Sequence, residues 1–164
     1  KIQEDAHMNK IRNAFEDKKA FIAYLTAGDP DLETTKELIL AMEQTGVDVI
    51  EIGIPCENIV AELSESRESN RRAIEAGTKA EDVFEMILSI NKSVRVPIVV
   101  LAYLENIKEY GISRFMRKCK ECSCTRCNLN GTKACYVETA IKELSRYEQA
   151  MDSITPVADY LENP

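Results

Sequence analysis

The chain has 164 residues, a length typical of one globular domain, and 45% of them are hydrophobic, which is enough for a core. Its formal net charge is −7, so no overall basic field exists to attract nucleic acid or an anionic membrane surface. The longest apolar runs, 21–25 and 97–104, are far shorter than the roughly 20 residues that cross a bilayer. We therefore expect neither a nucleic-acid partner nor a membrane partner.

The first eight residues are polar and contain no apolar segment of the kind that a secretory signal needs. We interpret residues 1–8 as a leader or cloning remnant. This interpretation predicts a cytoplasmic location, where thiols stay reduced and clustered cysteines suggest a metal site before they suggest disulfides.

Helical and extended patterns alternate along residues 9–121. In chain order, we expect a helix at 9–17, a strand at 20–27, a helix at 34–44, a strand at 47–55, a short helix that follows a polar stretch and ends near residue 77, a helix at 80–91, a strand at 96–104 and a helix at 112–119. The strand at 47–55 is rich in β-branched residues, as expected of a strand buried on both faces. This alternation predicts βαβ units and a parallel sheet, open or closed into a barrel.

The alternation is expected to stop at Cys122. Residues 122–135 contain no apolar run able to form the next strand, and residues 128–131 have turn chemistry. A final amphipathic helix is predicted over residues 136–154.

Five of the six cysteines lie between Cys119 and Cys135. Four of them, Cys122, Cys124, Cys127 and Cys135, have the spacing C-x-C-x2-C-x7-C, which is compact enough to hold one tetrahedral zinc ion or one iron–sulfur cluster. The crowded spacing favours the cluster over zinc. Free thiols or disulfides in a substituted loop are the alternative, and Cys119 is expected to be a small buried apolar residue.

Several segments in this order resemble one enzyme family. They are the helix at 9–15, YLTAGDP at 24–30, VDVIEIGIP at 47–55, AGTKAEDVFEMI at 76–87, VPIVVLAYLE at 96–105 and YGISRFMRKCKE at 110–121. Together they are similar to the tryptophan synthase alpha subunit, a (βα)8 barrel. The resemblance implies an α/β fold with a partial TIM-barrel-like parallel sheet at residues 9–121, followed at residues 122–164 by the Cys-rich loop and the C-terminal helix.

The family cleaves indole-3-glycerol phosphate into indole and glyceraldehyde 3-phosphate, with two carboxylates handling the protons. The resemblance implies that Glu51 is the catalytic acid or base, near the carboxyl end of a barrel strand, where catalytic groups normally lie. Glu62 stands where the family has its second carboxylate, an aspartate. Tyr103 stands where the family has a tyrosine of the substrate pocket, although core packing is the preferred explanation of this residue.

Two departures from the family weigh against catalysis. The loop after the second strand reads CENIVAELS at 56–64, where the family has approximately FSDPxADGP, and nothing after residue 121 resembles the family's later strands or phosphate-binding loops. We therefore expect a truncated alpha-like protein that acts as a binding or assembly component without lyase activity. The alternative is a carbon–carbon lyase in which Glu51 and Glu62 act together and a partner chain completes the barrel. A third reading is a rearranged or engineered sequence that keeps family segments as a scaffold.

Three βα units cannot close a barrel, so an unpaired strand edge and an uncovered sheet face are expected. The Cys-rich loop and the final helix could cover them within the chain. Otherwise a protein partner is needed, either a second copy in a homo-oligomer or a tryptophan synthase beta-type subunit.

Overall fold

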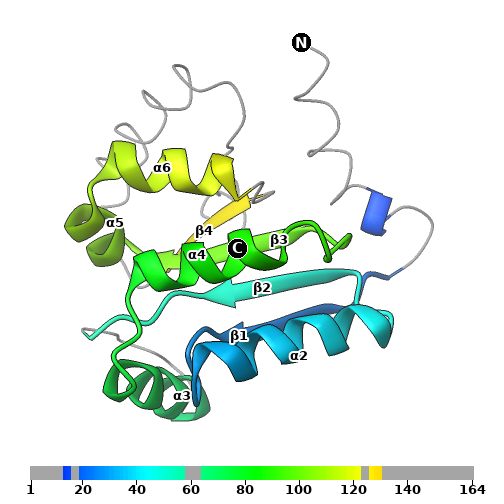
Figure 1. Ribbon diagram of the computed structural model, residues 1–164, viewed down its shortest axis with the longest axis horizontal. Coiled ribbons are helices and arrows are strands. Elements are labelled where there is room, and N and C mark those ends of the chain that lie inside the picture. Colours follow the sequence, from blue (N-terminus) through cyan, green and yellow to red (C-terminus); the bar gives the residue numbers. More distant parts are fainter. Residues whose placement is uncertain (1–12, 16–18, 58–63, 123–125, 131–164) are drawn as a thin grey trace.

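The computed structural model describes residues 13–15, 19–57, 64–122 and 126–130. Its centre is one parallel sheet in which the strands follow chain order, so each strand pairs with the next (Figure 1). The strands are β1 (Ile22–Thr26), β2 (Val49–Gly53), β3 (Ile98–Tyr103) and β4 (Arg126–Asn130). This order is the one in which successive βα units build the wall of a barrel.

Helices occupy the connections between these strands. They are α2 (Leu32–Gln44), α3 (Ser64–Glu75), α4 (Ala80–Ile90), α5 (Leu104–Tyr110) and α6 (Ile112–Glu121). Helices α2, α4 and α6 are neighbours in one layer, whereas α3 lies beside β1 and α5 lies beside β3. Because parallel strands need a crossover between them, each of the three connections carries at least one helix.

The two faces of the sheet differ in what covers them. Ile50, Ile52 and Val100 are fully buried against the helix layer, in a core that also contains Phe84 and Phe115. Alternate residues of a strand point to opposite faces. Residues between these therefore belong to the other face, which the described helices α2, α4 and α6 do not cover.

The uncovered face is aligned across the first three strands. Tyr24 of β1 is paired with Glu51 of β2, and Glu51 is paired with Val99 of β3. Among the described residues, Val99 and Val49 of this face pack with Ala14 in a small cluster near the starts of the strands. A sheet with helices on one face is the arrangement of a barrel wall, whose other face points to the barrel axis.

The expectation that the alternation stops at Cys122 was wrong. β4 lies inside the Cys-rich segment and pairs in parallel with β3, with Val99 opposite Arg126 and Tyr103 opposite Asn130. The search for an apolar run missed it because its sequence, RCNLN, has one aliphatic residue. Backbone pairing with β3 forms this strand, so the sheet has four strands where three were expected.

Two helices also differ from expectation. The sequence predicted only a short helix after a polar stretch, but α3 already begins at Ser64. Arg71 forms ion pairs with Glu68 and Glu75 along this helix, the spacing at which opposite charges stabilise a polar helix. Helix α5 directly follows β3, in a segment for which the sequence predicted no element.

The whole predicted leader, the 9–17 helix apart from residues 13–15, and the predicted helix at 136–154 lie outside the described residues. Within the described part of the chain, no helix is both long enough and apolar enough to cross a membrane.

Candidate functional site

Glu51 lies on the uncovered face, in the middle strand of the first three. It is half-buried, and its backbone is fixed by pairing with Tyr24 on one side and Val99 on the other. The sequence predicted a strand position near the carboxyl end, and the structure places Glu51 in the middle of β2, on the face that would point to the barrel axis. Its catalytic role is a prediction that geometry alone does not test.

Tyr24, which is paired with Glu51 across β1 and β2, is a polar neighbour that sequence reasoning missed. Its hydroxyl forms a hydrogen bond of 3.2 Å with Thr26 Oγ1, and this atom forms a second one of 2.9 Å with Ser69 Oγ of α3. Partial burial of the ring, together with the negative charge of Glu51, raises the pKa of Tyr24, while the bond to Thr26 opposes this rise. Tyr24 therefore stays a neutral hydroxyl beside Glu51 at physiological pH.

Gly53 makes room for this tyrosine. A Cβ at position 53 would lie 2.5 Å from the Tyr24 hydroxyl oxygen, closer than real side chains approach. The ring of Tyr24 thus lies across β2, at the residue pair Thr26–Gly53. An alternation of Ile22, Tyr24 and Thr26 along β1 was the only signal in the sequence that these side chains share a face.

Tyr103 is the last residue of β3 and is 8% exposed. Burial raises its pKa to about 12, and the nearby Tyr24 and Cys56 act in the same direction. The structure therefore brings Tyr103 and Tyr24 to the same end of the sheet as Glu51. Whether Tyr103 binds a substrate stays a prediction.

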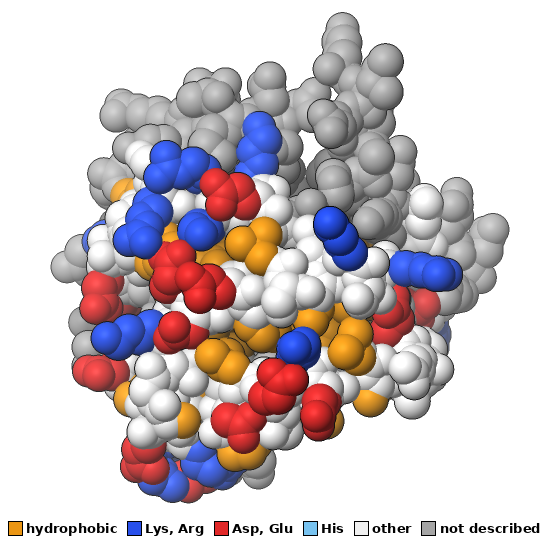
Figure 2. Space-filling view, viewed as in Figure 1, with side chains coloured by type: hydrophobic (Ala, Val, Ile, Leu, Met, Phe, Trp, Pro, Cys, Tyr) orange, Lys and Arg blue, Asp and Glu red, His pale blue; other side chains and the backbone are white. Residues whose placement is uncertain are grey.

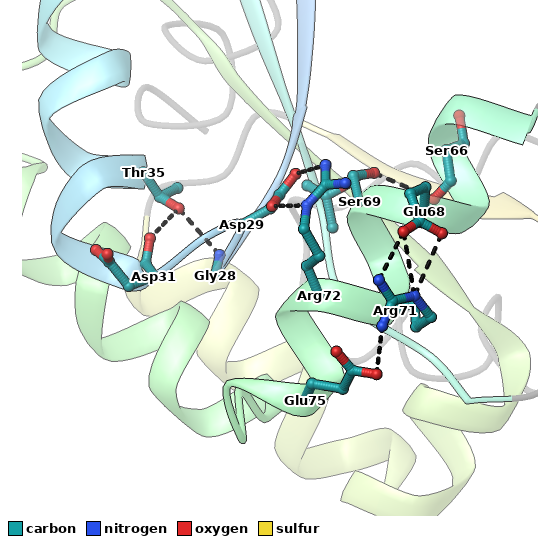
Figure 3. A network of polar contacts seen from close by, with 11 residues as sticks. Gly28, Asp29, Asp31, Thr35, Ser66, Glu68, Ser69, Arg71, Arg72 and Glu75 are labelled. Carbon is teal, nitrogen blue, oxygen red and sulfur yellow. Dashed lines mark hydrogen bonds and ion pairs between the residues drawn. The ribbon is translucent and has the colours of Figure 1, made fainter.

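The turn after β1 is fixed to two helices (Figure 3). Asp29 accepts hydrogen bonds of 2.7 and 2.8 Å from the Arg72 guanidinium of α3, and this contact holds the pKa of Asp29 below its usual range. The Gly28 amide donates to Thr35 Oγ1 of α2 at 2.9 Å. These contacts hold the rim of the uncovered face beside β1.

A cavity of about 510 Å³ opens beside the carboxyl ends of β2 and β3. It is lined by residues 55–57 on one side and by residues of α4, α5 and α6 on the other, among them Glu81, Asn106 and Arg114. Four glutamates and two basic residues line it, so its wall is mainly acidic. Lys and Arg side chains gather instead over α6, at the upper left of Figure 2.

Three residues of the predicted sites lie outside the described residues: the second carboxylate Glu62 and the metal ligands Cys124 and Cys135. Cys122 is 1% exposed, and its thiol donates to the Phe84 carbonyl oxygen at 3.5 Å in the helix-side core. Cys127 is a residue of β4. Among described residues, no three His, Cys, Asp or Glu side chains gather as metal ligands would. The four-cysteine metal site therefore stays a prediction.

Comparison with known proteins gives one consistent family. The model of the family "Tryptophan synthase alpha chain" matches residues 11–127. The tryptophan synthase alpha chain of Alkaliphilus metalliredigens is 41% identical over 114 residues, which are 69% of this chain and 43% of that protein. The alpha chain of Caldanaerobacter subterraneus is 38% identical over 118 residues, 69% of this chain and 45% of that protein. The chain thus spans less than half the length of these curated relatives.

Solved structures agree with these matches. The tryptophan synthase alpha chain of Legionella pneumophila superposes with a TM-score of 0.78 at 25% identity, over 94% of this chain and 55% of that one. A tryptophan synthase complex from Pyrococcus furiosus gives a TM-score of 0.74 at 26% identity, over 84% of this chain and 55% of that one. The four-stranded sheet therefore corresponds to part of a barrel.

Proposed function

The chain belongs to the tryptophan synthase alpha chain family, and from this premise we propose that it supplies the acid–base strand of a carbon–carbon lyase for indole-3-glycerol phosphate. One observation carries the proposal. Glu51, which the family resemblance marks as catalytic, lies half-buried on the sheet face that the helix layer leaves uncovered. A strand carboxylate on the opposite face would lie against the helix layer, where a substrate could not reach it.

The proposed reaction breaks the bond between the indole ring carbon and the carbon that carries the glycerol hydroxyl. The hydroxyl loses its proton as the aldehyde forms, and the ring carbon gains a proton as indole leaves. A carboxylate close to both atoms can accept the first proton and deliver the second. We assign this transfer to Glu51, and Tyr24, as a neutral hydroxyl, lies at the same place as a hydrogen-bond donor.

The proposed lyase needs more barrel strands than the four that the structure describes. Four strands are half of the eight that the family resemblance implies, and the substrate phosphate is bound in such barrels by loops after the last strands. We propose that other βα units close the uncovered face. A protein partner can supply this cover, either a second copy of the chain or a tryptophan synthase beta-type subunit.

A binding or assembly role without lyase activity is the second candidate. The observation in its favour is the altered segment after β2, in which Cys56 is buried where the resemblance implies phenylalanine, and Glu62 replaces the aspartate. A separate proposal is that Cys122, Cys124, Cys127 and Cys135 bind zinc or an iron–sulfur cluster. Metal and acid-labile sulfide analysis of anaerobically purified protein tests it, and a metal-free result refutes it.

A mixing experiment separates the two functional candidates. The chain is combined with the C-terminal half of a full-length relative, and indole release from indole-3-glycerol phosphate is followed. Each polypeptide alone is the control. The lyase proposal predicts indole only in the mixture. If sedimentation shows a complex of the two polypeptides and the mixture still releases no indole, the assembly role is favoured.

A further inference from the structure

The chain leaves the sheet after β2 through two buried residues. The last bond of the β2–β3 ladder runs from the Ile54 amide to the Leu101 carbonyl oxygen at 2.9 Å. Pro55 and Cys56 follow, and Cys56 is 6% exposed. Buried peptide groups need hydrogen-bond partners, and beyond the last ladder bond the sheet no longer supplies them.

Asn70 of α3 supplies both partners of Cys56. The Cys56 amide donates to Asn70 Oδ1 at 2.9 Å, and Asn70 Nδ2 donates to the Cys56 carbonyl oxygen at 2.7 Å. Two residues directly opposite in an antiparallel ladder exchange the same pair of bonds. Asn70 is itself only 7% exposed, so this side chain takes the place of a neighbouring strand at a point where water is excluded.

Asn106 of α5 holds the adjacent residue. Its Nδ2 donates to the Pro55 carbonyl oxygen at 2.8 Å, and its Oδ1 accepts from the Tyr103 amide at 3.1 Å. One side chain thus joins the end of β2 to the end of β3. The two asparagines come from different helices and bind consecutive residues of the same segment.

We propose that Asn70 and Asn106 are positioning residues of the candidate site. They fix the path by which the chain leaves β2 and keep the end of the Glu51 strand aligned with Tyr103. As a statement about catalysis, this rests on the proposed function. The chemistry requires an amide side chain, because a carboxylate offers no donor to a carbonyl oxygen and a hydrophobic side chain offers neither bond.

Cys56 provides a reporter for this proposal. Its side chain is only 6% exposed, so alkylation is slow while the segment is closed, and a rise in the labelling rate above that of the wild type measures local opening. Asn70→Ala removes both bonds to Cys56, and Asn106→Ala removes the bond to Pro55. Cys119, which is fully buried in the helix-side core, reports the opening of the whole fold in the same sample.

The experiment compares labelling rates, mapped by mass spectrometry, in the wild type, Asn70→Ala, Asn106→Ala and the control Asn91→Ala. Asn91 is the C-terminal cap of α4, at the start of the connection that leads to β3. We expect Cys56 labelling to accelerate roughly five- to a hundredfold in Asn70→Ala, the range that corresponds to losing partners of buried peptide groups. A smaller acceleration is expected in Asn106→Ala, and Cys119 should change less than about twofold in every variant.

Unchanged Cys56 labelling in both variants would overturn the proposal. Equal acceleration at Cys56 and Cys119 would also overturn it, because the asparagines would then support only the fold as a whole. If Asn70→Ala does not fold, Asn106→Ala still decides. The readout needs no catalytic activity, so its failure is distinct from a failure of the proposed lyase function.

Discussion

Gly28, in the turn after β1, is a residue at which two constraints coincide. Its φ of +86° lies in the left-handed region, and a Cβ would lie 2.0 Å from Thr78 Oγ1. Gly46, after α2, has a similar φ of +89° but no atom within 4 Å of the Cβ position. Alanine at position 46 would therefore introduce backbone strain alone, whereas alanine at position 28 would add a steric overlap with Thr78.

We predict that Gly46→Ala lowers the free energy of unfolding by about 1 kcal/mol, the cost of a left-handed non-glycine residue. Gly28→Ala should cost roughly 3 kcal/mol, because Thr78 must also move. Urea unfolding followed by circular dichroism measures both variants. If both variants lose the same free energy of unfolding, Thr78 can move away at no cost, and the predicted steric penalty at position 28 is wrong.

Single residues were predictable where they interrupt a pattern. Glu51 stood out as a charge in an apolar strand, and the structure places it on the uncovered face. Asn70 and Asn106 gave no such signal, because an asparagine in a polar helix is ordinary and its partners lie 14 and 51 residues away. Tyr24 was hidden for a related reason, since only the strand register shows which residues share its face.

Glu81 is the charged contact that holds three helices together. From the first turn of α4 it accepts a hydrogen bond from the Tyr110 hydroxyl of α5 and forms ion pairs with Arg114 at 2.5 Å and Lys118 at 3.1 Å, both on α6. The Arg114 guanidinium also lies 4.5 Å from the centre of the Tyr110 ring. The bond from Tyr110, followed by the one from Lys118, lowers the pKa of Glu81.

A group whose pKa is lowered on folding stabilises the protein above its unfolded pKa, and this contribution is lost as pH falls through the folded pKa. We therefore expect Glu81→Gln to melt a few degrees below the wild type at neutral pH, a small effect because solvent screens the exposed pairs. The difference should shrink as pH falls through the acidic range. Calorimetry at several pH values checks this, with Glu85→Gln on the same helix as control. A difference that does not vary with pH would contradict the role given to the Glu81 charge.

Helices and strands were predictable where their burial produces apolar runs or a regular spacing of apolar residues in the sequence. The apolar runs gave β1, β2 and β3, and the helical spacing gave α2, α4 and α6. β4 was missed because a strand can form by backbone pairing without an apolar sequence, and α5 was missed because it begins directly at the end of β3. Both are local structures set by a neighbour in space, which periodicity along the chain does not reveal.

At the scale of the whole molecule, the sequence predicted a parallel sheet but left open whether it was a flat sheet or a barrel wall. The structure favours the barrel wall, because α2, α4 and α6 form one layer and Ile22 and Tyr24 on the other face are 47% and 45% exposed. The solved relatives agree, since this chain matches 55% of the length of the Legionella pneumophila alpha chain. A four-stranded wall of this kind presents Glu51 to whatever closes the barrel.

The central claim, that Glu51 performs the proton transfer within such a closed barrel, is tested most directly by its removal. Glu51→Gln keeps the size of the side chain and removes its proton-transfer capacity, and Glu37→Gln, an exposed residue of α2, is the matched control. In the complemented mixture, we expect kcat for indole release to fall roughly 10²- to 10⁴-fold in Glu51→Gln and to stay near the wild-type value in Glu37→Gln. Indole release at the wild-type rate by Glu51→Gln would contradict the account.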